Sequence, residues 1–169
     1  MKYDFSDHYS YLYYPIKGHY TFETETGLTY QVYFTDGSGY FEAYPEIAHY
    51  FLMFGFLILE SKEPNPDLKV WATIYHILLD FLANNQKALL FVCDTKDDKQ
   101  AQRHRLFSIW YNRLRTTDRK EVEKFDMILE SKEMKLFTSL LISKQHIEYE
   151  AIVKAFLDLQ QHYQDKLSN

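Results

Sequence analysis

Cysteine is almost absent from this sequence: 169 residues contain one, Cys93. A single cysteine cannot form a disulfide within the chain, which excludes a disulfide-stapled secreted scaffold. We therefore expect a cytoplasmic protein in a reducing environment. Cys93 lies in the apolar run ALLFVCD, where a free cysteine is typically a small buried hydrophobe. A nucleophile or a metal ligand is the alternative interpretation.

Long apolar runs and catalytic motifs are missing as well. The longest apolar run, YFLMFGFLIL at residues 50–59, is too short to cross a bilayer, and the Tyr-rich start MKYDFSDHYSYLYYP has no signal-peptide core. We find no Walker loop, nucleophile elbow or dinucleotide fingerprint. The seven histidines and Cys93 form no metal-ligand spacing. We expect no membrane span, no metal and no resident cofactor.

Apolar periodicity predicts the order of the elements. Residues 19–34 alternate around a Thr-Gly turn, as in a β-hairpin, and DGSG at 36–39 is a turn or loop with a short strand as an option after it. A nearly all-apolar strand follows at 49–61, then a helix at 68–84 capped by Asp67 after Pro64 and Pro66. The next segments are predicted as a buried strand (87–94) and a helix (96–116) with Leu106, Phe107, Trp110 and Leu114 on its apolar stripe. Two strands joined by a polar turn (123–143) and a helix (147–163) follow.

This order is not a regular β-α-β alternation. It predicts an α+β fold, in which a mostly antiparallel sheet of six or seven strands carries three helices. The length fits one domain over residues 1–169. We divide it into a partly ordered N-terminal arm (1–18), a sheet-and-helix core (19–143) and a C-terminal helix (144–169).

From residue 19 to 143 the strand and helix order resembles the core of the Gcn5-related N-acetyltransferase fold. The stretch QAQRHRLFSIWYNRL also looks like a late helix of that family. The resemblance covers about three quarters of the chain and implies an acyl-CoA-using transferase. The chain is also similar to small uncharacterised bacterial families in which a strand, an aspartate and an Arg-rich helix follow one another.

One part of the acetyltransferase pattern is replaced. In that family a Gly-rich loop before the first of these helices binds the pyrophosphate of acetyl-CoA through backbone N–H groups. Here the same place reads ESKEPNPDLKVWATIYH, without glycine, with two prolines that lack the N–H donor and with three acids. Acidic side chains at a helix N-terminus oppose a diphosphate.

The most distinctive feature is a basic segment at residues 96–120. It holds eight basic and three acidic residues, a charge of +5 in a chain of −5. Such a patch can attract an anionic partner, so we take six residues as candidate ligand-binding or partner-binding positions: Asp94, Lys96, Arg103, Arg105, Arg113 and Arg115. The structural alternative is that Asp94 and Arg103 form an ion pair that locks the strand-helix turn and that the other arginines form a solvated face.

Two functions remain open. The first is a non-enzymatic binding module that uses this basic helix surface to hold a protein or an anionic ligand; the acidic pI of 5.8 argues against nucleic acid. The second is a divergent acyltransferase that uses acetyl-CoA. The enzyme requires a splayed gap between the strands at 49–61 and 87–94, whereas the binding module expects the strands to pair and side chains to fill the gap. Homodimerisation through the Tyr-rich arm is a third option.

Overall fold

The computed structural model describes residues 7–93, 99–114, 120–130 and 135–167, with side chains up to residue 162. Its centre is one seven-stranded sheet in the order β1-β2-β3-β4-β5-β7-β6. The strands are β1 (Tyr11–Tyr14), β2 (His19–Glu23), β3 (Thr29–Asp36), β4 (Phe51–Ile58), β5 (Ala88–Val92), β6 (Val122–Glu130) and β7 (Lys135–Ser143). All neighbours pair antiparallel except β4 and β5, which are parallel. The predicted α+β class is confirmed.

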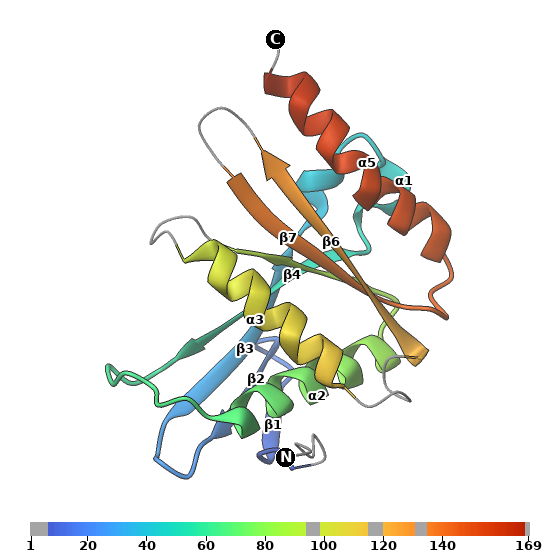
Figure 1. The fold of residues 1–169 in the computed structure, drawn as a ribbon. Helices are drawn as coiled ribbons and strands as arrows, with labels where there is room; N and C mark the ends of the chain where they lie inside the picture. The colour runs from blue at the N-terminus through green and yellow to red at the C-terminus, as the bar shows by residue number, and fades with distance from the viewer. Residues whose placement is uncertain (1–6, 94–98, 115–119, 131–134, 168–169) are drawn as a thin grey trace.

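Three long helices cover the sheet: α2 (Leu68–Asn84), α3 (Gln100–Arg113) and α5 (Tyr149–Leu167). Helix α2 begins where the sequence predicts, because the Asp67 carboxylate accepts a hydrogen bond from the Lys69 N–H at 2.9 Å. In Figure 1, α5 runs beside β6 and β7, α2 lies toward β1 to β3, and α3 lies between α2 and the β6–β7 pair.

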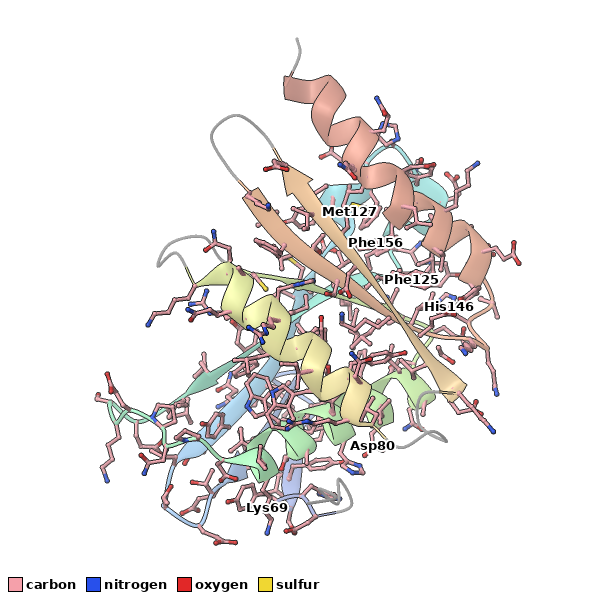
Figure 2. All side chains as sticks on the ribbon, in the orientation of Figure 1. Lys69, Asp80, Phe125, Met127, His146 and Phe156 are labelled. Atoms are coloured by element: carbon pink, nitrogen blue, oxygen red, sulfur yellow. The ribbon has the colours of Figure 1, made fainter. Side chains whose placement is uncertain are left out.

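The sheet has a core on each face because successive side chains of a strand point to opposite sides. In β5, Leu89 and Phe91 join the core under α2 and α3, and Ala88 and Leu90 join the core under α5. The second core also contains Met127 and Phe156, which Figure 2 labels between β6 and α5. The near-continuous apolar composition of β5 follows from this burial on both faces.

Two local expectations differ from the structure. The segment after DGSG forms a short 3-10 helix, η1 (Ser38–Phe41), and the short helix α1 (Pro45–Ala48), so the optional strand there is wrong. Pro45 occupies the first turn of α1, where its missing N–H costs no hydrogen bond. Residues 11–14, which the sequence pattern placed in the N-terminal arm, form β1 and pair with β2 along their full length.

Candidate functional site

A groove of about 600 Å3 opens where β4, α2 and α3 meet. Its floor is the end of β4 with Tyr30 of β3, one wall is the 64–68 segment with the first turn of α2, and the other wall is α3. Figure 1 shows the connection from β4 to α2 extending to the side of the molecule before it returns to α2. The residues that line the groove are Tyr30, Phe56, Leu57, Ile58, Pro64, Asn65, Pro66, Asp67, Leu68, Val70, Trp71, Leu106 and Trp110.

The wall of the groove is aromatic. The Trp71 and Trp110 rings stack at 5.6 Å with an interplanar angle of 11°, and Phe56 meets Trp71 edge to face at 5.4 Å. The Arg113 guanidinium lies 4.9 Å from the Trp110 ring centroid, within the range of a cation–π interaction. Both tryptophans of the chain therefore line this one groove.

Helix α3 presents two kinds of side chain to the groove. Arg103, Leu106, Trp110 and Arg113 recur at helical spacing and share one stripe. Leu106, expected on the core stripe, is 42% exposed and lines the groove instead. Because Arg103 and Arg113 lie one turn to either side of the lining residues, the α3 wall has a cationic side chain near each end. Arg105 is exposed and projects away from this stripe.

Asp67 is the carboxylate that lines the groove, and both of its oxygens accept hydrogen bonds within the fold. Asp67 accepts from the Lys69 N–H with one oxygen and from the Tyr9 hydroxyl at 2.8 Å with the other. Burial, with the Asp67 charge nearby, raises the pKa of Tyr30, so its hydroxyl stays protonated at neutral pH. Glu60, just after β4, accepts from the Thr29 N–H at 2.7 Å and ties β4 to β3.

An aromatic cluster fills the space where β4 and β5 separate. The two strands are in register for only three pairs, from Phe51 with Ala88 to Met53 with Leu90. Beyond this point Phe54, Phe91 and Phe107 pack with ring centroids 4.6 to 5.6 Å apart, and each is less than 9% exposed. The strands thus diverge, as the enzyme requires, but side chains fill the first part of the gap, as the binding module expects.

A second polar cluster lies between α3 and the β6–β7 pair. The Lys124 side chain is 2% exposed; its ammonium pairs with Asp126 and donates to the Ser108 hydroxyl at 3.0 Å. Asp126 also accepts from His104 at 3.1 Å and from Ser139 at 2.6 Å. These contacts hold the pKa of Asp126 well below its usual range, although partial burial opposes them. The cluster joins α3 to the β6–β7 edge of the sheet.

Cys93 is buried, as its apolar surroundings predict. It is 1% exposed at the end of β5, and burial raises its pKa to about 11. The positive charges of Arg103 and Lys124 act on this pKa in the opposite direction and only partly offset the effect of burial. Within the described ranges, no group of three His, Cys, Asp or Glu side chains is arranged to hold a metal. None of the described helices is long and apolar enough to cross a membrane.

The structure brings together only some of the predicted site residues. Arg103 and Arg113 flank the groove and Arg105 does not, while Asp94, Lys96 and Arg115 lie outside the described residues. Sequence reasoning missed the groove itself. Two features of the sequence could have indicated the groove: Pro64 and Pro66, which the sequence pattern interprets only as residues that end a strand, and the apolar Leu68 and Trp71 that follow them. It also missed Lys124 and Asp126, whose two-residue spacing puts both charges on one face of a strand.

The fold and the groove define a class: an α+β domain with a two-sided core and an apolar groove beside a basic helix. A family model described as a family of unknown function, DUF6169, matches residues 66–158, more than half of the chain. The protein belongs to this family. The matched region runs from the groove's Pro66 through α3 to α5. A comparison with curated proteins finds no match.

Proposed function

We propose that the protein is a non-enzymatic binding module whose ligand lies in the groove between β4 and the α2–α3 pair. The ligand has an apolar part, which contacts the Trp71 and Trp110 side of the groove, and an anionic part, which lies against Arg103 or Arg113. The observation that carries the proposal is this pairing of an apolar groove with arginines on one helix stripe.

The surroundings of the groove support binding without chemistry. A general acid or base needs a polar group free to reach the substrate, whereas the two Asp67 oxygens already accept from the Lys69 N–H and from the Tyr9 hydroxyl. The apolar mouth supports binding as well, because Leu57, Leu68 and Leu106 are each about two-fifths exposed at the groove. Exposed apolar side chains grouped in this way are typical of ligand or partner sites.

The alternative is an acyl-CoA-dependent transferase, which the divergence of β4 and β5 favours. An acyl-pantetheine arm would then lie in the same groove. Pro64 and Pro66 oppose this proposal, since they line the groove where the acetyltransferase family has its phosphate-binding glycines. The Phe54, Phe91 and Phe107 cluster opposes it too, because it fills the first part of the gap.

The test uses the two tryptophans as built-in reporters. The probe is anilinonaphthalene sulfonate, a fluorescent apolar anion that matches both halves of the proposed ligand. We expect saturable binding by the folded protein, with energy transfer from tryptophan to the dye. Leu106→Asp should weaken binding roughly tenfold or more, because it places a charge in an apolar site.

The control is Leu157→Asp, at a residue of α5 that is 51% exposed and outside the groove. It should leave the affinity unchanged. Both variants must melt cooperatively like the parent, since the dye also binds loosely packed states. Equal affinity in the Leu106→Asp protein would overturn the proposal. Saturable quenching of tryptophan fluorescence by acetyl-CoA, relieved by the dye, would favour the transferase.

A further inference from the structure

One edge of β4 has no strand partner beyond Met53 in the described part of the chain. The register of β4 with β5 ends at Met53 and Leu90, whereas its register with β3 continues to Ile58. An open strand edge exposes backbone donors and acceptors that can pair with another extended chain.

The backbone hydrogen bonds at the two ends of β4 show which backbone groups face this edge. On the β5 side, the Tyr50 carbonyl accepts from the Ala88 N–H at 2.9 Å. On the β3 side, the Phe51 carbonyl accepts from the Gly37 N–H at 3.0 Å and the Leu59 N–H donates to Thr29 at 2.9 Å. Because backbone groups alternate along a strand, the even-numbered residues face the β5 side. The backbone groups of Phe56 and Ile58 therefore face the open edge.

The same two residues line the groove. The groove thus combines apolar walls with backbone donors and acceptors that repeat every second residue, about 6.6 Å apart. A ligand that meets both features has amide groups at the same repeat and side chains that alternate between two faces. An extended polypeptide has this chemistry.

We propose that the groove binds an extended, acidic peptide segment of a partner protein, which adds as a strand to the free edge of β4. Alternate apolar side chains of the peptide enter the groove between Trp71 and Leu106. Its carboxylates lie toward Arg103 and Arg113, because these cations stand near the two ends of the α3 wall. This inference rests on the proposed function and names its ligand class.

The probe is a random library of twelve-residue peptides displayed on phage, selected on the parent protein and in parallel on the Leu106→Asp variant. We expect the parent to enrich peptides with apolar residues at every second position and an excess of Asp and Glu. The enriched peptides, made synthetically, should quench tryptophan fluorescence and displace anilinonaphthalene sulfonate.

Backbone methylation of the peptides tests strand addition itself. Replacing alternate N–H groups by N-methyl removes the donors and leaves every side chain unchanged. Peptides methylated at the odd positions are compared with peptides methylated at the even positions. In one of these two sets we expect affinity to fall at least roughly tenfold, and the other set is the matched control. Arg113→Glu should reduce the binding of acidic peptides and spare neutral ones, as a charge contact requires.

Several outcomes would overturn the inference. In the first, the parent protein enriches no peptides that the Leu106→Asp variant does not also enrich. In the second, the two sets of N-methylated peptides bind with equal affinity. Dye binding in the groove without peptide binding would leave the proposed function standing and remove only the peptide. Absence of dye binding would remove both.

Discussion

At the scale of single residues, Lys124 is a buried cation whose position depends on one carboxylate. Its ammonium is nearly inaccessible to water, and burial lowers its pKa while the Asp126 carboxylate opposes that shift. The ammonium lies 5.5 Å from the Phe107 ring centroid and 5.9 Å from that of Tyr111. An ammonium in such a place requires its counter-charge.

We expect Asp126→Asn to reduce the free energy of unfolding by about 2 kcal/mol. This is below the usual range for buried pairs, because Asp126 itself keeps partial contact with water. Chemical denaturation measures the change. The matched control is the double variant Lys124→Met with Asp126→Asn, which removes both charges and should recover most of the loss. A double variant less stable than the single one would show that the pair is not the cause.

At the scale of elements, the groove depends on how α2 begins. Asp67 caps the helix and also binds the Tyr9 hydroxyl, and Lys69 in the first turn pairs with Asp7 at 3.2 Å. Figure 2 labels Lys69 at this end of α2. The 64–68 wall of the groove is thus held in place by the helix cap rather than by a strand.

Asp67→Ala should cost about 1 kcal/mol, which for a chain of this size lowers Tm by roughly 2–4 °C. Asp67→Ser keeps a capping oxygen and should retain most of the stability. The same pair tests the groove: the alanine variant should bind anilinonaphthalene sulfonate more weakly than the serine variant. If both variants melt and bind alike, the cap does not position the groove wall.

At the scale of the whole molecule, one buried histidine links stability to pH. His146, in the connection from β7 to α5, is 5% exposed and packs edge to face on Tyr50 at 4.9 Å. Its Nδ1 accepts from the Glu148 N–H at 3.0 Å, a bond that protonation of Nδ1 would break. Burial lowers its pKa, so the unfolded chain takes up a proton at a higher pH than the native protein.

The stability that depends on neutral His146 is therefore complete above the unfolded pKa of about 6.5 and is lost as pH falls toward the native pKa. We expect Tm to decline between about pH 7 and pH 5.5. His146→Asn should flatten this part of the profile, whereas His162→Asn, at an exposed residue of α5, should not. A profile of unchanged slope in the His146→Asn protein would contradict the assignment.

Much of the fold follows from local pattern. The alternation around the Thr-Gly turn and the helical spacing after Asp67 predict β2, β3 and α2 correctly, because burial of one face and a capping side chain act within a few residues. The basic composition of the segment that contains α3 is likewise a property of the sequence alone. It identifies Arg103 and Arg113 without indicating what they flank.

The groove was decided by tertiary structure. Its floor exists because β4 leaves β5 after three paired residues, and no local pattern records where two strands 37 residues apart stop pairing. Leu106 shows the same limit: helical spacing places it beside Phe107 on an apolar stripe, but only the positions of β4 and α2 decide that one is buried and the other lines a groove. Burial is a property of the neighbours that a residue meets in space, and these neighbours are distant in the chain.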